Sequence, residues 1–148
     1  MPRIQNSIVI REDPARVFAI TNDIERWPVL FNEYQGANVL KHEAAGRFTR
    51  LVFQLRNQQG NAWRSWRLMN HQELVAIAER EEPLYPFLFM HFKWTYAPAP
   101  ERTLMTWTQD FELDPAFPDS LSVVIERMNV HTRDNQQRIK EIIENGQA

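Results

Sequence analysis

Six segments in which apolar and polar residues alternate follow one another between residues 37 and 113. The segments lie at about 37–44, 47–57, 61–71, 73–82, 87–97 and 103–113. Alternation with a period of two, interrupted at regular intervals by turn residues, is typical of an antiparallel meander. This pattern constrains the fold more than any other feature, and it predicts a sheet built from sequential hairpins.

The residues on either side of these segments predict one more strand and three helices. The expected elements are a strand at residues 6–11, a helix capped by Asp13 with Pro14 at its first position, a short helix capped by Asn22-Asp23 and ending near Phe31, and a long helix from Asp119-Ser120 to about Asn145. This order predicts an α+β fold in which a curved antiparallel sheet of about seven strands wraps around the C-terminal helix. A sheet of this kind often leaves an internal pocket.

The chain has 148 residues, only four glycines and no cysteine. This length predicts one domain over residues 1–148. The missing cysteines exclude disulfides and thiolate ligands, and four glycines cannot build a phosphate-binding loop. The histidines stand far apart, with no carboxylate at a metal-ligand spacing. We therefore expect no metal and no cofactor.

The charges nearly balance, with Lys+Arg 17 against Asp+Glu 19 and a net charge of -2. Such a chain has no overall field that attracts nucleic acid or an anionic membrane. No apolar run approaches the roughly 18 residues that cross a bilayer, and the first residues lack the apolar core of a signal peptide. We expect no nucleic-acid or membrane partner and a cytoplasmic protein.

Two predicted strands carry large aromatic side chains on one face. The inward sets are expected to be Met90, Phe92, Trp94 and Tyr96 in one strand and Met105, Trp107, Gln109 and Phe111 in the other. A third strand places Trp63, Ser65 and Arg67 on one face and Arg64 and Trp66 on the other. Periodicity alone does not decide which arginine is inside. Wide rings with a few polar atoms suit a packed core and a ligand chamber alike.

The long helix carries one stripe with steps of three and four residues. Its members are Leu121, Val124, Ile125, Met128, Thr132, Asn135, Ile139 and Ile142. The stripe is apolar except at Thr132 and Asn135. These two either bond the preceding turn or a buried water, or they line a cavity with Gln109 that opens to solvent at one end.

Five segments in this order resemble the single-domain aromatase/cyclases of bacterial aromatic (type II) polyketide pathways. They are TNDIERWPVLFNEY at Thr21–Tyr34, the alternation Trp63-x-Ser65-x-Arg67, MHFKWTY at Met90–Tyr96, MTWTQDF at Met105–Phe111 and NVHTRDNQQRIKEIIE at Asn129–Glu144. Those enzymes belong to the START-like, helix-grip superfamily, which includes the Bet v 1 allergens. The resemblance implies a deep pocket between sheet and helix. It also implies a poly-β-ketone substrate on an acyl carrier protein of a polyketide synthase, which is closed by aldol cyclisation and dehydrated to an aromatic ring.

The resemblance also implies roles for single residues. Arg67 matches the arginine proposed to anchor a substrate carbonyl or enolate, and Tyr34 matches the proposed acid/base hydroxyl. The substrate-binding set comprises Trp27, Trp63, Ser65, Trp94, Trp107, Gln109 and Asn135 from the family match, with Met90 and Thr132 from the face patterns. Asn61 stands where family members of the closest type have a second tryptophan, and the resemblance leaves open the local pocket width and the position of ring closure.

Two other functions remain open from the sequence. A protein of the same fold can carry a hydrophobic ligand such as a quinone, a lipid or a finished polyketide without catalysis. Stacked aromatic rings can also bind single-stranded nucleic acid, but that needs a basic groove that the charge balance does not provide.

Because acyl carrier proteins of these pathways are acidic, the outward-facing residues Arg50, Arg56 and Arg64 are expected to form a docking patch for the carrier protein.

Overall fold

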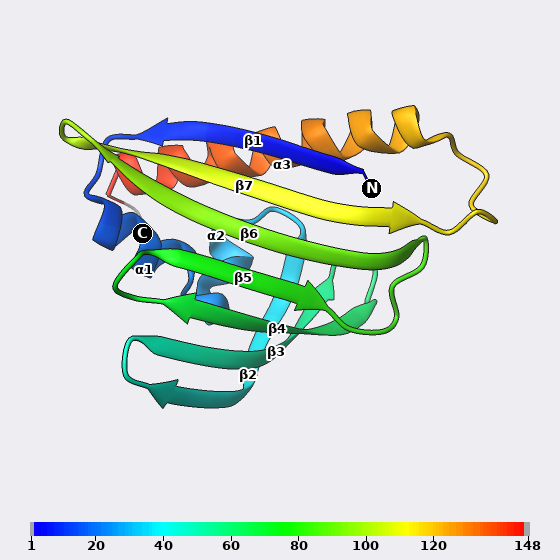
Figure 1. The fold of residues 1–148 in the computed structure, drawn as a ribbon, viewed down its shortest axis with the longest axis horizontal. Helices are drawn as coiled ribbons and strands as arrows, with labels where there is room; N and C mark the ends of the chain where they lie inside the picture. The colour runs from blue at the N-terminus through cyan, green and yellow to red at the C-terminus, as the bar shows by residue number, and fades with distance from the viewer. Residues whose placement is uncertain (1, 147–148) are drawn as a thin grey trace.

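The computed structural model describes residues 2–146, and in it seven strands form one curved sheet with a long helix along its inner side (Figure 1). The strands are β1 (Arg3–Ile10), β2 (Tyr34–Ala45), β3 (Phe48–Asn57), β4 (Ala62–Asn70), β5 (Val75–Arg80), β6 (Phe87–Ala99) and β7 (Arg102–Leu113). Their order is β1-β7-β6-β5-β4-β3-β2, and every pair is antiparallel. The expected meander is therefore confirmed, with β1 closing it beside β7.

The helices are α1 (Pro14–Thr21), the short 3-10 helix η1 (Ile24–Arg26), α2 (Trp27–Leu30) and α3 (Leu121–Glu144). The caps expected at the starts of α1 and α3 are confirmed, since Asp13 accepts from the Arg16 N–H and Ser120 from the Val123 N–H. The side-chain cap expected at Asn22-Asp23 is wrong: in the described chain no side chain caps η1. There the Asp23 backbone carbonyl accepts from the Arg26 N–H, which makes a 3-10 turn that leads into α2.

Three strand boundaries differ from the expected ones for physical reasons. β1 begins at Arg3 rather than at residue 6. Ile4 and Asn6 are buried on one face of the strand, but the polar residues around them hide this alternation in the sequence. β2 begins at Tyr34, and two register shifts near its start break the period of two. β5 begins only at Val75, because the Asn70 side chain accepts backbone N–H groups of the next turn.

Helix α3 is tied to the edge strand β1 by side-chain hydrogen bonds. Gln136 Nε2 donates to the Asn6 carbonyl at 3.0 Å, and Lys140 Nζ donates to the Val9 carbonyl at 2.6 Å. The free edge of the sheet is thereby covered. The helix stripe is confirmed from Val124 to Ile142, but Leu121 is 42% exposed, so its expected place in the buried stripe is wrong. Leu121 is the first residue of the helix, where no preceding turn covers it.

The buried apolar side chains form two clusters rather than one. The larger gathers around α1, α2 and the inner faces of β3, β6 and β7, with Trp27, Phe53 and Trp94 at its centre. The smaller contains Ile4, Leu84, Met90 and Phe111. One main core with a smaller satellite cluster is usual for a domain of this size. The smaller cluster is therefore a satellite of the main core.

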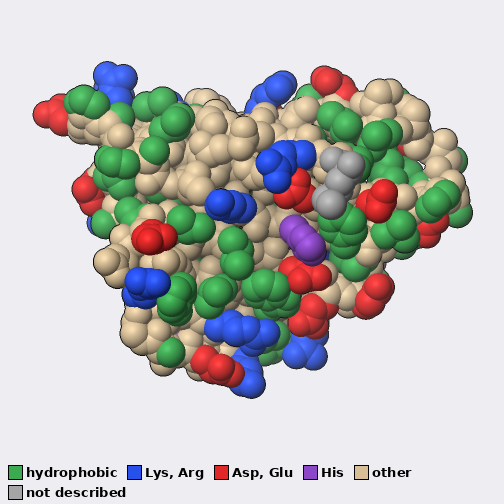
Figure 2. Space-filling model, viewed as in Figure 1, with side chains coloured by type: hydrophobic (Ala, Val, Ile, Leu, Met, Phe, Trp, Pro, Cys, Tyr) green, Lys and Arg blue, Asp and Glu red, His purple; other side chains and the backbone are tan. Residues whose placement is uncertain are grey.

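The outer face of the sheet carries the arginines that were expected to point outward. Arg50, Arg56 and Arg64 are exposed on β3 and β4, so the inward assignment of the Arg67 face is confirmed. Figure 2 shows that Lys and Arg side chains lie among acidic ones over this part of the molecule. Between residues 2 and 146, no helix has both the length and the apolar character that would let it cross a bilayer.

Candidate active site

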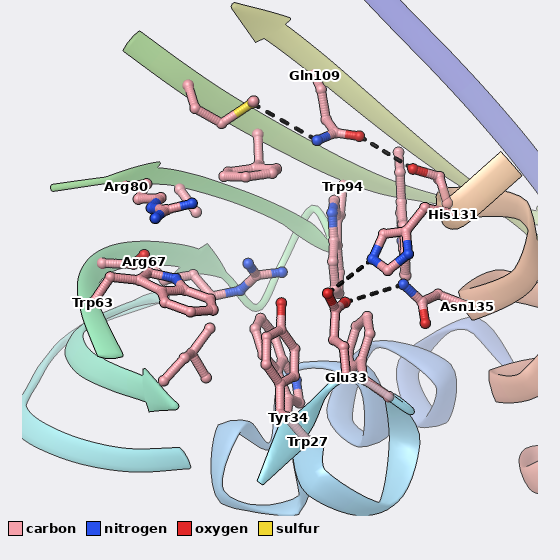
Figure 3. Close-up of a pocket in the computed structure, with 18 of the residues that line it drawn as sticks. Trp27, Glu33, Tyr34, Trp63, Arg67, Arg80, Trp94, Gln109, His131 and Asn135 are labelled. Atoms are coloured by element: carbon pink, nitrogen blue, oxygen red, sulfur yellow. Dashed lines mark hydrogen bonds and ion pairs between the residues drawn. The ribbon is translucent and has the colours of Figure 1, made fainter. Parts of the chain in front are cut away.

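A cavity of about 360 Å³ lies between the sheet, α2 and α3 (Figure 3). Every residue that the sequence assigned to the site lines this cavity: Trp27, Tyr34, Trp63, Ser65, Arg67, Met90, Trp94, Trp107, Gln109, Thr132 and Asn135. Its walls are drawn from both apolar clusters, so it occupies the gap between them. The lining also includes His131, whose side chain is 56% exposed, so the cavity reaches the surface there.

Four aromatic rings form a continuous stack along one wall. Trp94 and Trp107 are direct partners across β6 and β7, and their rings are parallel with centroids 4.1 Å apart. Trp27 stacks on Trp94 at 5.8 Å, and Tyr34 stacks on Trp27 at 5.8 Å. Such offset aromatic contacts are rigid and apolar. They give the chamber a rigid, apolar wall against which an apolar or conjugated molecule can pack.

Arg67 places a positive charge inside this aromatic chamber. Its side chain is 2% exposed, and the guanidinium carbon lies 4.2 Å from the Trp94 ring centroid. Burial lowers the pKa of Arg67 to about 10, so the group stays charged at neutral pH. Within residues 2–146 no carboxylate pairs with it, and its Nη2 has no hydrogen-bond partner. The guanidinium is thus a buried cation on the cavity wall that no carboxylate neutralises, and it would pair with a ligand oxygen that reaches it.

The guanidinium is held from behind by a network that starts in α1. Arg67 Nε donates to Asn22 Oδ1 at 2.7 Å. Asn22 in turn donates to the Tyr96 hydroxyl at 3.1 Å and to the Phe18 carbonyl at 2.9 Å. Because both amide hydrogens of Asn22 are engaged, its oxygen is turned toward the arginine. The network fixes the direction in which the free edge of the guanidinium points.

Tyr34 lies at the first residue of β2, beside Glu33 and above the Trp27 ring. Burial and then the negative charge of Glu33 raise the pKa of Tyr34 well above its usual value. The phenol is therefore protonated at neutral pH, and it acts as a hydrogen-bond donor or acid rather than as a base. Figure 3 shows its hydroxyl pointing into the space between the Arg67 guanidinium and the Glu33 carboxylate.

The polar residues of α3 face the cavity, and each bonds a side chain across it. Thr132 Oγ1 donates to Gln109 Oε1 at 3.3 Å, and Gln109 Nε2 approaches Met90 Sδ at 3.7 Å. Asn135 Nδ2 donates to Glu33 Oε1 at 3.2 Å. Of the two alternatives left open by the helix pattern, cavity lining is correct. Gln109 and Asn135 retain hydrogen-bonding capacity toward a ligand.

Glu33, His131 and Arg80 are polar lining residues that the sequence analysis missed. Glu33 Oε2 lies 2.8 Å from His131 Nε2. Arg80 packs its guanidinium 4.6 Å from the Trp63 ring centroid, and its buried Nε has no hydrogen-bond partner among the described residues. Each had a usable signal. His131 precedes Asn135 by four residues on the helix, Arg80 continues the inward alternation of Ala76 and Ala78, and Glu33 adjoins Tyr34.

Asn61 lies away from the cavity. The residue is exposed in the turn between β3 and β4 and is not part of the described cavity lining. Its backbone N–H donates to Asn57 Oδ1 at 3.0 Å. The strand β4 begins after this turn at Ala62, and Trp63 is the first of its inward-facing residues.

Comparison with known proteins gives sequence matches over most of the chain. The profile of a family described as polyketide cyclase / dehydrase and lipid transport matches residues 1–144. A protein of Streptomyces cyaneus named "Putative polyketide cyclase" is 39% identical over 117 residues, which are 77% of this chain and 75% of that protein. A Streptomyces halstedii protein of the same name is 38% identical over 106 residues, covering 70% and 94% respectively.

Solved structures share the fold at low sequence identity. A protein from Thermus thermophilus aligns with a TM-score of 0.77 at 19% identity, over 99% of this chain and 100% of that one. The Zhui aromatase/cyclase from a Streptomyces species gives 0.73 at 14% identity, over 98% and 92%. A START superfamily protein from Mycobacterium smegmatis gives 0.70 at 16% identity, over 97% and 94%. The helix-grip architecture is thereby confirmed.

The contact between Glu33 and His131 makes the stability of the fold depend on pH. The hydrogen bond to Glu33 raises the pKa of His131 above its ordinary value of 6.5. The stabilisation is therefore complete below the unfolded value and is lost as pH rises through the folded one. Urea unfolding should show wild type more stable than His131→Gln near about pH 5.5, by no more than about 1 kcal/mol because both groups are partly exposed. A difference independent of pH would contradict this assignment.

Proposed function

The chain belongs to the polyketide cyclase/dehydrase and lipid transport family, and from that premise we propose that it is a polyketide cyclase. In this proposal the cavity folds a poly-β-ketone delivered by an acyl carrier protein. The enzyme then catalyses intramolecular aldol cyclisation and dehydration to an aromatic ring. The observation that carries the proposal is the unpaired guanidinium of Arg67 inside an aromatic chamber.

The proposed first step joins two carbons of the bound chain. A methylene between two carbonyls is already acidic, so the enzyme mainly has to place one nucleophilic carbon against one carbonyl carbon. The Arg67 N–H groups stabilise the enolate oxygen that forms when the methylene loses a proton. As the new carbon–carbon bond forms, the attacked carbonyl oxygen becomes an alkoxide. Tyr34 supplies the proton that converts it to a hydroxyl.

The proposed second step removes that hydroxyl as water. A second proton leaves the nucleophilic carbon and the carbon–oxygen bond breaks, which forms a double bond in the ring. The remaining ring carbonyls then enolise, and the ring becomes aromatic. Trp27, Trp94 and Trp107 hold the chain flat during both steps, since their stacked rings form the wall. Acid, base and oxyanion stabilisation account for the chemistry, and we expect the reaction to need neither metal nor cofactor.

The rival function is a carrier that holds a quinone, lipid or finished polyketide without turning it over. The family description itself includes lipid transport, and most of the cavity wall is apolar. Incubation with a minimal polyketide synthase separates the two. If the protein is a cyclase, the spontaneous shunt products of the synthase are replaced by a product whose ring is closed at one position. If it is a carrier, the product distribution stays unchanged.

The substrate is proposed to arrive on an acidic carrier protein that docks on the outer face of β3 and β4. Arg50, Arg56 and Arg64 are exposed there. Gln54 on β3 is paired with Arg64 on β4, so these two polar residues are neighbours across the strands. Complementary charges of this kind mainly speed association. The patch would hold the carrier while its pantetheine arm reaches the cavity.

Replacing Arg67 should nearly abolish cyclisation. Arg67→Ala removes the enolate donor, an effect of about 3 to 4 kcal/mol if the group acts as a preorganised oxyanion donor. Arg67→Lys keeps the charge but not the planar fork, so only part of the rate should return. Product formation with the minimal synthase is the measurement, and Arg102→Ala, at an exposed arginine of β7, is the control. Equal effects at Arg67 and Arg102 would remove Arg67 from the mechanism.

Tyr34→Phe should slow cyclisation by roughly tenfold or more without changing the melting temperature. The variant keeps the ring that stacks on Trp27 and deletes the hydroxyl oxygen alone. Rates under saturating synthase and thermal melts of both proteins provide the comparison. Unchanged turnover would assign Tyr34 to packing only.

Charge reversal at Arg50 and Arg56 should raise the apparent KM for carrier-bound substrate and leave a small thioester mimic unaffected, because only the carrier touches the outer face. Arg102→Glu serves as the matched reversal elsewhere on the sheet. If both substrates respond equally, the patch does not bind the carrier.

A further inference from the structure

Glu33 connects the interior of the cavity to the surface. One carboxylate oxygen lies 2.8 Å from His131 Nε2, and the other accepts from Asn135 Nδ2 at 3.2 Å. The Glu33 side chain is 31% exposed and that of His131 is 56% exposed. Both residues line the cavity. Because both carboxylate oxygens of Glu33 have a hydrogen-bond partner, the orientation of the carboxylate is fixed. The partly exposed imidazole of His131 can exchange protons with solvent.

The pair lies beside the groups already placed in the mechanism. In Figure 3 the Glu33 carboxylate, the Tyr34 hydroxyl and the Arg67 guanidinium follow one another along the floor of the cavity. The negative charge of Glu33 is one cause of the raised pKa of Tyr34, which agrees with their proximity. A substrate oxygen held by Arg67 would therefore place the neighbouring carbon close to the carboxylate.

The proposed reaction needs a base that Tyr34 cannot supply. A phenol that stays protonated at neutral pH donates a proton to the alkoxide, but it does not remove one from carbon. Among the described residues that line the cavity, Glu33 is the carboxylate and His131 is the imidazole. Arg67 and Arg80 carry positive charge and cannot serve as bases at this pH.

Resting on the proposed cyclase function, we propose that Glu33 is the catalytic base that takes the carbon-bound proton of the substrate, and that His131 is the positioning residue that orients Glu33 and links it to solvent. Carboxylates and histidines are the groups that most often perform such transfers. The site then contains a proton acceptor, Glu33, in addition to the proton donor Tyr34.

The protons balance over the cycle. In the aldol step Glu33 takes one proton from the methylene carbon, and Tyr34 gives one proton to the new alkoxide. The proton on the Glu33–His131 pair then returns to the Tyr34 phenolate, so the site regains its starting state. In the dehydration step the proton that Glu33 takes from carbon leaves with the hydroxyl as water. No oxidant, reductant or further reactant is consumed.

The charged surroundings of His131 set the direction of the pH effect. Glu33 and Asp134, the latter also on α3, favour the imidazolium. Tyr34 on β2, Arg67 on β4 and Arg80 on β5 line the same cavity as Glu33. The imidazolium that grips Glu33 is lost as pH rises through the raised pKa of His131. The cyclisation rate should fall over that interval.

The test measures the pH dependence of cyclisation with the minimal synthase. Glu33→Gln keeps the shape of the side chain and the bond to Asn135 but removes the base, so the rate should fall about 100-fold. Glu33→Asp keeps a carboxylate and should recover part of it. His131→Gln should lose roughly fivefold, and the fall of rate at high pH should disappear.

The chain offers a matched control on the outer face of the sheet. His91 Nε2 lies 3.5 Å from Glu79 Oε1, a similar pair that does not line the cavity in the described chain. His91→Gln should leave rate and pH profile unchanged. Wild-type rate with Glu33→Gln, or a high-pH limb that persists in His131→Gln, would overturn the inference while the cyclase function stands. Wild-type protein that cyclises nothing would instead overturn the proposed function.

Discussion

An unpaired cation in an aromatic cavity is the constraint on which the rest of the site depends. Removing a guanidinium from water costs several kcal/mol, on the order expected for any buried ion, and Arg67 recovers only part of this from Asn22 and the Trp94 ring. The fold stabilises this arrangement through the Asn22–Tyr96 network and through Ala78, the small neighbour of Arg67 on β5. A cost of this size is typical of functional sites.

The cavity follows from how the sheet and the helix meet. The sheet curls around α3, and Thr132 and Asn135 present short polar side chains to the space between them, which stays open as the cavity. Hydrogen bonds from α3 to β1 and from Asn135 to Glu33 fix the helix against the sheet without closing the gap. The helix α3 therefore stabilises the β1 edge of the sheet and still leaves the cavity open between itself and the middle of the sheet.

Periodicity predicted the elements and the inward faces because burial in a sheet repeats every two residues, as Met105, Trp107 and Phe111 show. It failed where local geometry breaks the period, at the register shifts of β2 and the Asn70 turn before β5. The family resemblance, not the pattern, distinguished Arg67 from Arg64. The position of Glu33 and of His131 beside predicted site residues was a usable signal, but their pairing was not predictable, because residues 98 apart in sequence meet only after the helix has packed.

We infer that the Arg67 guanidinium receives a substrate oxygen. A crystal structure with a stable, pantetheine-linked mimic of a poly-β-ketone would show whether it does. We expect a mimic oxygen within hydrogen-bond distance of a guanidinium nitrogen of Arg67, with the chain lying along Trp27, Trp94 and Trp107. A mimic bound outside the cavity, or bound inside it with no oxygen near the guanidinium, would refute the inference.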